Sequence, residues 1–292
     1  MAKRAAVLLR DLGESGLAGA DATARAVPAV TRSIAILRLL ARSRQPLGVN
    51  AIARALDIVP STCLHILRAL VAEEMVAVDS ATKRYVLDAG VLTLARSALR
   101  QDSFARVAQP ELDSLSASLG ATAIGVRVIG LQHMIVVAIS RSEVAFRLHV
   151  DVGSRFPALI SATGRCLAAF GNHSTHDLEQ AFRALRWDAA PRYEAWQAEV
   201  ASTRRAGFGV DKGNYIRGVT IVAAPVVGIE GWMTHALVAV GLSDQMRQAG
   251  PGEVGSALRA AAARVSAQLG GFDGLTGSDV APAGPNSNNE RR

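Results

Sequence analysis

The chain has 292 residues, of which 50% are hydrophobic and 20% are charged, so it can build packed cores over about two domains. This composition excludes disorder over the whole chain, a collagen-like repeat and a secreted disulfide-rich class. The net charge of +7 is unevenly placed: residues 28–100 hold ten basic and five acidic residues, whereas residues 101–292 hold 18 and 17. We therefore expect a basic module with a polyanionic partner, joined to a nearly neutral body.

Several features favour a cytoplasmic protein without a membrane partner. The longest uncharged apolar run, residues 219–229, is shorter than a membrane span. The apolar run near the N-terminus, residues 5–9, is too short for the core of a signal peptide. Two cysteines, Cys63 and Cys166, cannot form a disulfide framework and fit a reducing compartment.

Residues 28–88 carry the pattern of a small module of helices followed by a hairpin. Helical spacing of apolar residues predicts three helices, over residues 31–43, 51–56 and 61–72. Asn50 is expected to cap the second helix. Apolar runs at residues 75–78 and 85–87 flank a charged tip, which predicts a β-hairpin. Three helices followed by a hairpin are typical of a winged helix-turn-helix.

The third predicted helix has an apolar and a polar face. At about 100° per residue, its apolar arc holds Cys63, Leu64, Ile66, Leu67, Leu70 and Val71. The opposite arc holds Ala69 and the four residues that we predict to face a major groove, Ser61, Thr62, His65 and Arg68. Hydroxyl groups bond phosphates or base edges, and a guanidinium binds guanine in a bidentate manner.

Four further residues are predicted to hold the DNA backbone or the minor groove. Arg32 is expected at the start of the first helix, where it and the helix N–H groups hold a phosphate, and Asn50 lies before the second. Lys83 and Arg84 lie on the hairpin tip. Two alternatives stay open, because amphipathic helices of this kind also face solvent and helix-turn-helix modules also dock proteins.

Beyond the hairpin, residues 89–102 are predicted to form a linker helix, and residues 103–272 a second domain. Its expected helices cover residues 104–119, 162–170, 175–185, 193–206 and 253–269. Its expected strands cover residues 122–129, 134–139, 145–150, 208–211, 219–227 and 236–242. Strands that pair around a helical insertion favour an antiparallel sheet with helices packed on it, an α+β fold. Residues 1–27 and 273–292 are predicted to be mobile tails.

The chain lacks the patterns of catalytic or metal chemistry, so we expect no enzyme and no cofactor. No Gly-x-Ser-x-Gly elbow occurs, and the glycines of residues 207–213 have the wrong spacing for a dinucleotide site. His173, His176 and Asp177 fit an exposed helix cap better than a zinc site. Cys166 is expected to be a small packed residue rather than a reactive thiol.

Segments in both halves carry a family resemblance. In the first half they are NAIARAL at residues 50–56 and STCLHILRAL at residues 61–70. In the second half they are SATGRCLA at residues 161–168, GFGVD at residues 207–211 and GVTIVAAPV at residues 218–226. In this order and spacing, over about residues 28–270, they resemble the IclR family of bacterial transcription regulators.

The resemblance implies a winged helix, a linker helix and a C-terminal effector-binding domain of GAF-like topology. It implies dimers, often paired into tetramers, on palindromic or repeated double-stranded DNA operators. It also implies a small-molecule effector, commonly an organic acid or an aromatic catabolite, that alters operator binding. A DNA-binding or docking protein without ligand response remains the alternative. In the recognition helix, His65 stands where the family usually has Arg.

The resemblance also points to effector-binding positions. A small-residue pair at the helix start matches Ala162 and Thr163, and a pocket acid matches Asp211. Three positions depart from the family's usual residues, namely Ile221 in place of a common cysteine, and Ala239 and Gly241 in place of polar residues. Asn214 also replaces an acid. The expected pocket is therefore more apolar than one for a two- or three-carbon keto acid, which favours a larger, partly hydrophobic or aromatic ligand.

Overall fold

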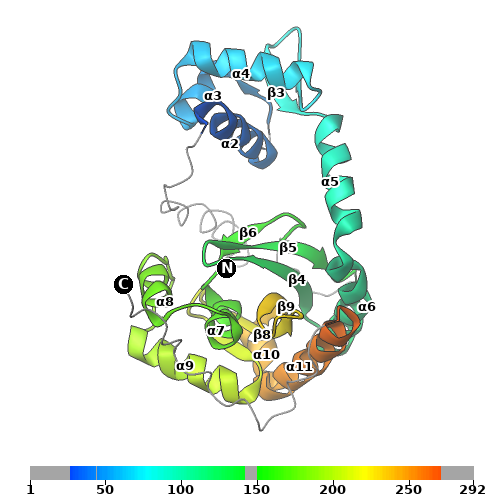
Figure 1. The fold of residues 1–292 in the computed structure, drawn as a ribbon, viewed down its shortest axis with the longest axis vertical. Coiled ribbons are helices and arrows are strands. Elements are labelled where there is room, and N and C mark those ends of the chain that lie inside the picture. Colours follow the sequence, from blue (N-terminus) through cyan, green and yellow to red (C-terminus); the bar gives the residue numbers. More distant parts are fainter. Residues whose placement is uncertain (1–26, 44, 142–149, 271–292) are drawn as a thin grey trace, which may run out of the picture. The chain divides into compact units, whose positions relative to one another are not determined.

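The computed structural model describes residues 27–43, 45–141 and 150–270 (Figure 1). They fall into two compact units that divide after Asp102, residues 27–102 and residues 103–270. The predicted tails lie outside the described residues except for Val27. The strand predicted over residues 145–150 also lies outside them except for Val150.

The first unit is a winged helix. Its helices are α2 (Pro28–Arg42), α3 (Val49–Ala55) and α4 (Pro60–Ala72), followed by the linker helix α5 (Ala89–Gln101). Its strands are β1 (Leu47–Gly48), β2 (Val76–Val78) and β3 (Arg84–Leu87), in the antiparallel order β1-β3-β2. The predicted helix order and hairpin are confirmed. The pattern missed β1, which is too short to show a period.

The core of the first unit uses one face of each helix. Its buried side chains include Ile36, Ile52, Cys63 and Leu67. Tyr85, from the hairpin of β2 and β3 that forms the wing, also packs into this core. Burying a side chain of the size of Leu or Ile contributes about 1.5–3 kcal/mol. Helix α4 begins at Pro60, which has no backbone N–H to leave unpaired and a φ already suited to a helix.

The second unit is built on a six-stranded antiparallel sheet of order β6-β5-β4-β9-β8-β7. The strands are β4 (Thr122–Ile129), β5 (His133–Ile139), β6 (Arg155–Pro157), β7 (Gly209–Lys212), β8 (Val219–Val227) and β9 (Met233–Leu242). The helices are α6 (Ser103–Leu119), α7 (Ser161–Phe170), α8 (Thr175–Arg183), α9 (Tyr193–Ala206), α10 (Ser243–Ala249) and α11 (Pro251–Gln268). The α+β architecture is confirmed, and β6 and α10 are additions to the prediction.

Helices cover both faces of the central strands. Helices α6 and α11 pack on one face and α7 on the other. Strand β8 is consequently buried along its whole length, with Ile221 and Ala223 toward α7 and Val222 and Ala224 toward α11. Burial on both faces explains why β8 reads as an apolar run rather than as an alternation.

Among the described residues, no single helix is long and apolar enough to span a membrane. Helices α3 and α4 taken together are long and apolar enough for a span, but the chain bends by 112° between them.

The entry of the chain into α7 is a site where added volume is not tolerated. Ser161 has a φ of +57°, and a Cβ on Gly164 would lie 1.9 Å from the carbonyl oxygen of Leu159. Because that neighbour is backbone, we expect Gly164→Ala to lower the free energy of unfolding by about 3 kcal/mol. Urea unfolding followed by tryptophan fluorescence measures this, because all three tryptophans lie in the second unit.

Gly252→Ala is the matched control, because a Cβ there meets no atom within 4 Å. This substitution in the first turn of α11 should leave the stability unchanged or raise it by up to about 1 kcal/mol. Equal effects of the two substitutions would contradict the steric account.

Candidate functional site

The outer face of α4 is the first candidate site. Ser61, His65 and Arg68 are exposed and Thr62 is partly buried, whereas Cys63, Ile66 and Leu67 are the buried residues of the helix. Residues three and four positions apart share a face of a helix. The four residues predicted to face a groove therefore present hydroxyl, imidazole and guanidinium groups together, on a helix whose other side is fixed in the core.

Two residues predicted to contact the DNA backbone, Arg32 and Asn50, lie at other helix positions than predicted. Helix α2 begins at Pro28, so Arg32 is exposed a full turn inside the helix and not beside its free N–H groups. The residue before α3 is Gly48, and Asn50 is the second residue of α3, exposed and without a capping bond. The extended β1 brings the helix start forward by two residues, which the sequence pattern did not reveal.

The wing tip is ordered by Asp79. Its carboxylate accepts backbone N–H bonds from Ala81 and Thr82, both at 2.8 Å. These bonds lower the pKa of Asp79, with that from Thr82 the larger cause. Lys83 is exposed with a φ of +54°, and Arg84 donates through Nη1 to the carbonyl of Pro46 at 3.1 Å. Lys83 therefore extends from the tip, while Arg84 also holds the segment before β1.

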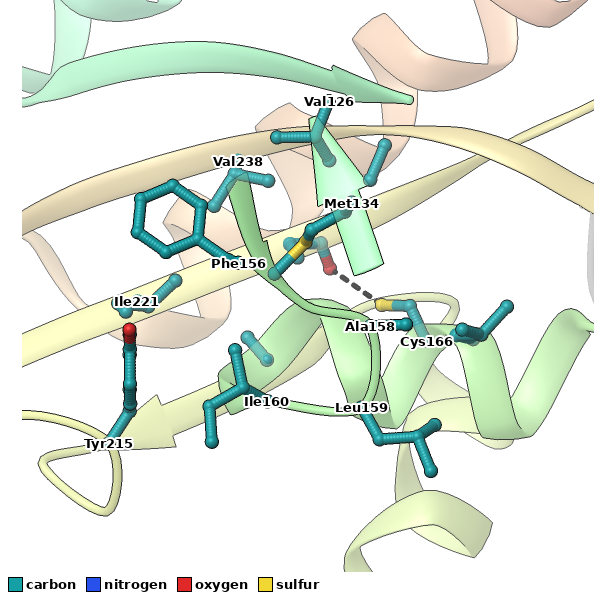
Figure 2. Close-up of a cluster of buried hydrophobic side chains, with 14 of the residues drawn as sticks. Val126, Met134, Phe156, Ala158, Leu159, Ile160, Cys166, Tyr215, Ile221 and Val238 are labelled. Carbon is teal, nitrogen blue, oxygen red and sulfur yellow. Dashed lines mark hydrogen bonds between the residues drawn. The ribbon is translucent and has the colours of Figure 1, made fainter. Parts of the chain in front are cut away.

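The second candidate site is an apolar cavity between α7 and the sheet. Figure 2 shows several of its lining side chains, among them Phe156, Ile160 and Tyr215. It contains about 450 Å³ of empty space, including its opening to solvent. Three polar residues line it, Ser161, Thr163 and Tyr215. The other lining residues are apolar: Ile124, Val126, Met134, Val150, Phe156, Ile160, Ile216, Ile221, Val238 and Val240. Such walls accept a hydrophobic or aromatic body.

One end of the cavity is the start of α7. The backbone N–H groups of Ser161, Ala162 and Thr163 have no acceptor among the described residues, and the first intrahelical bond runs from Gly164 to Ile160. The first turn contains no acidic residue. Free N–H groups and the helix dipole make this end attractive to an anion such as a carboxylate.

The predicted effector-binding residues are only partly brought together. Thr163 and Ile221 line the cavity, and Ala162 is fully buried at the start of α7. Ala239 packs on the opposite face of the sheet, and Gly241 lies against Met246 there. The prediction for Ala239 and Gly241 is corrected, because side chains alternate along a strand and their neighbours Val238 and Val240 line the cavity.

Asp211 has a structural role beside the cavity rather than in its wall. One carboxylate oxygen accepts N–H bonds from Gly213 at 2.9 Å and Asn214 at 2.7 Å, and the other lies 3.5 Å from Nη1 of Arg165. Burial raises the pKa of Asp211, whereas Arg165 and the N–H bonds oppose that rise. Asp211 therefore shapes the turn that follows β7.

Arg165 is a residue whose role the sequence pattern missed. Its side chain is 1% exposed, and its Nε bonds to Glu199 of α9 at 2.6 Å. Nη1 donates to the carbonyl of Ser161 at 2.8 Å, and Nη2 donates to the amide oxygen of Asn214 at 2.9 Å. One guanidinium thus joins the start of α7, the turn after β7 and α9. The available signal was an arginine within the apolar run SATGRCLAAF.

The other chemically active residue types have local roles. Cys166 is buried, its Sγ donates to the carbonyl of Ala223 at 3.2 Å, and burial raises its pKa to about 12, so it is a packed thiol. Ser174 caps α8 by accepting the N–H of Asp177 at 3.1 Å, which confirms a cap in that segment. Within the described part of the chain, no three potential metal ligands are grouped.

Two protein-family profiles match the chain. Residues 29–80 match the IclR helix-turn-helix domain, and residues 96–267 match the bacterial transcriptional regulator IclR C-terminal domain. The second match alone covers more than half of the sequence.

Individual proteins and solved structures are also similar to this chain. The glycerol operon regulatory protein of Streptomyces griseus is 30% identical over 257 residues, covering 85% of this chain and 98% of that protein. An IclR transcriptional regulator from Alicyclobacillus acidocaldarius has a TM-score of 0.74 at 26% identity, covering 84% and 99%. An IclR homologue from Microbacterium hydrocarbonoxydans, solved with 4-hydroxybenzoate, has a TM-score of 0.67 at 19% identity, covering 82% and 98%.

The Arg165 contacts predict that replacing this buried arginine lowers the free energy of unfolding much more than replacing an exposed arginine. Arg165→Met leaves the buried Asp211 carboxylate without its cation, so we expect the free energy of unfolding to fall by about 3–5 kcal/mol. Arg183→Met removes a surface pair with Glu179 in which Arg183 is 73% exposed, and should cost less than about 0.5 kcal/mol. Urea unfolding compares them, and a loss below 1 kcal/mol for Arg165→Met would contradict the assigned role.

Proposed function

The chain belongs to the IclR family of bacterial transcription regulators, and on that premise we propose that a small organic effector controls its sequence-specific binding to operator DNA. A DNA-binding helix-turn-helix and an IclR C-terminal domain make it a transcription regulator. The observation that carries the finer proposal is that an exposed polar helix face and an apolar cavity beside the start of α7 occur in its two separate units.

For DNA, we assign the outer face of α4 to the major groove, through Ser61, Thr62, His65 and Arg68. Support comes from the exposure of Ser61, His65 and Arg68, with Thr62 partly buried beside them, and from the basic excess of residues 28–100. The proposed backbone and minor-groove contacts are Arg32, Asn50, Lys83 and Arg84, all exposed. Of these, Lys83 extends from the wing tip, whereas Arg84 shares its guanidinium with the Pro46 carbonyl.

For the effector, we assign the cavity beneath α7 to a hydrophobic or aromatic carboxylate. The apolar walls and the free N–H groups at Ser161, Ala162 and Thr163 support this choice. The 4-hydroxybenzoate bound to the Microbacterium relative is an aromatic carboxylate, which agrees with this class of ligand. In this proposal, Ile221 contributes to the wall and Asp211 acts by shaping the adjacent turn. The effector must bind one DNA-binding state more tightly than another.

We also propose that the protein binds a palindromic or repeated operator as a dimer or as a pair of dimers. Val30 and Ile34 lie one turn apart on α2 with 60% and 42% exposure, and Leu92 and Leu94 of α5 are 70% and 61% exposed. Burying such side chains between two copies is favourable. We place the protein in the cytoplasm, where it reaches DNA, and assign it no catalytic activity.

Two substitutions distinguish base readout from phosphate binding. Arg68→Ala should cost about 1–3 kcal/mol on operator DNA recovered from genomic fragments and relax the preference at one base position. Lys83→Ala should weaken operator and unrelated DNA by the same factor and reduce the salt slope by about 1. Fluorescence anisotropy over a series of salt concentrations measures both.

Arg204→Ala is the control for this comparison, because Arg204 is exposed on α9 in the other unit. Its binding should equal that of the wild type. If Arg68→Ala and Lys83→Ala also bind both DNAs like the wild type, the assignment of α4 and the wing to DNA is wrong.

Filling the cavity should separate ligand binding from DNA binding. Val238→Phe adds a ring to the cavity wall of β9 and leaves the winged helix unchanged. Wild-type protein should show a rise in melting temperature with hydrophobic carboxylates, because a ligand that binds only the folded state stabilises it. The variant should lose that rise while keeping its operator affinity. A wild type without any such rise would favour a regulator without ligand response.

A further inference from the structure

The hydroxyl of Tyr215 is a polar group that the fold leaves unpaired. Tyr215 follows β7, is 3% exposed and lines the cavity, and its buried hydroxyl oxygen has no hydrogen-bond partner among the described residues. Figure 2 shows that the hydroxyl points toward Ile221 and Phe156, two apolar wall residues. A buried hydroxyl without a partner is unfavourable, so its presence in a ligand cavity calls for an explanation.

The backbone of Tyr215 is held firmly. Its N–H lies 3.3 Å from a carboxylate oxygen of Asp211, and the preceding Asn214 is bonded to Arg165 and, through its amide nitrogen, to the carbonyl of Ala189 at 3.1 Å. Arg165 also binds the carbonyl of Ser161 at the start of α7. The same guanidinium therefore fixes both the segment that carries the Tyr215 hydroxyl and the helix end that offers free N–H groups.

The two polar features have different chemistry. The start of α7 offers several N–H donors and the positive end of a helix dipole, which suits a carboxylate. The Tyr215 hydroxyl is neutral, because burial raises its pKa far above the usual value, and it can donate or accept one hydrogen bond. No charged side chain occurs among the described lining residues. A ligand that satisfies both features carries one carboxylate and one neutral oxygen on an apolar body.

Other unpaired buried groups do not compete for this role. Among the described residues, the hydroxyls of Ser116 and Thr122 and the indole nitrogens of Trp187 and Trp196 are also buried without a partner. None of these four residues lines the cavity. The Tyr215 hydroxyl is therefore set apart by its position in the wall of the effector site.

We propose that Tyr215 determines effector specificity by selecting an apolar monocarboxylate that carries a neutral hydroxyl or carbonyl oxygen. This inference rests on the proposed effector site and names the feature that distinguishes its ligand from a plain hydrophobic acid. The carboxylate binds the start of α7, and the second oxygen pairs with the Tyr215 hydroxyl.

Isothermal titration calorimetry on the full chain tests the proposal. The probes are phenylacetate, its ortho, meta and para hydroxy derivatives, the three methyl derivatives of matching size, and phenylacetamide. One hydroxy derivative should bind at least about tenfold more tightly than phenylacetate and than its methyl counterpart, because only the hydroxyl pairs with Tyr215. Phenylacetamide, which lacks the charge, should bind more weakly than phenylacetate.

Tyr215→Phe should bind phenylacetate as the wild type does and lose the preference for the hydroxy derivative. Because the removed hydroxyl has no partner in the part of the chain that the structure describes, the melting temperature without ligand should not fall. Tyr193→Phe, in α9 and outside the cavity wall, is the matched control and should keep the preference.

The outcomes separate this inference from the function on which it rests. If the wild type binds the hydroxy, methyl and unsubstituted probes equally, the role of Tyr215 is overturned and effector binding stays in place. The same conclusion follows if Tyr215→Phe keeps the preference for the hydroxy derivative. Even if Tyr215→Phe does not fold, the comparison of the probes on the wild type still tests the role of Tyr215. Failure of every carboxylate to bind the folded wild type overturns both this inference and the effector assignment.

Discussion

The guanidinium of Arg165 lies in the interior of the second unit, where an unpaired charge is strongly unfavourable. It is stable there only because Glu199, Asp211, Asn214 and the carbonyl of Ser161 surround it. Those partners come from three separate parts of the chain, so satisfying one cation fixes the position of α7 relative to α9 and the turn after β7. The wall of the cavity depends on that arrangement, because α7 supplies Ser161 and Thr163 and the turn supplies Tyr215.

A second constraint is the burial of the central strands on both faces. On β4, Ile124 and Val126 line the cavity, while Gly125 between them faces α6, where a Cβ would come within 2.9 Å of the Phe104 ring. Phe104 also stacks on His235 with ring centroids 4.1 Å apart. Helix α6 begins directly after Asp102, the residue that ends the linker helix α5. One strand therefore lines the cavity on one face and contacts the first turn of α6 on the other.

Periodicity was enough to predict the longer elements, because amphipathic helices and buried strands such as α4, α9 and β8 carry their burial pattern locally. It missed β1 and β6, which have two and three residues, and α10, which is separated from α11 only by Gly250. It also could not decide which face of β9 meets the cavity, since β9 is buried on both sides and a shift of one residue exchanges Ala239 for Val240. Arg165 and Tyr215 acquire their roles through contacts between distant segments, which no local pattern contains.

The central claim is that this regulator recognises a particular DNA sequence through the exposed face of α4. The most direct measurement is to incubate the purified full chain with sheared genomic DNA of its source and to sequence the fragments that it retains. The account predicts a recurring palindromic or repeated motif, retained by the wild type and relaxed at one base position by Arg68→Ala. Retained fragments without any shared motif would contradict it and would leave only non-specific binding to phosphates.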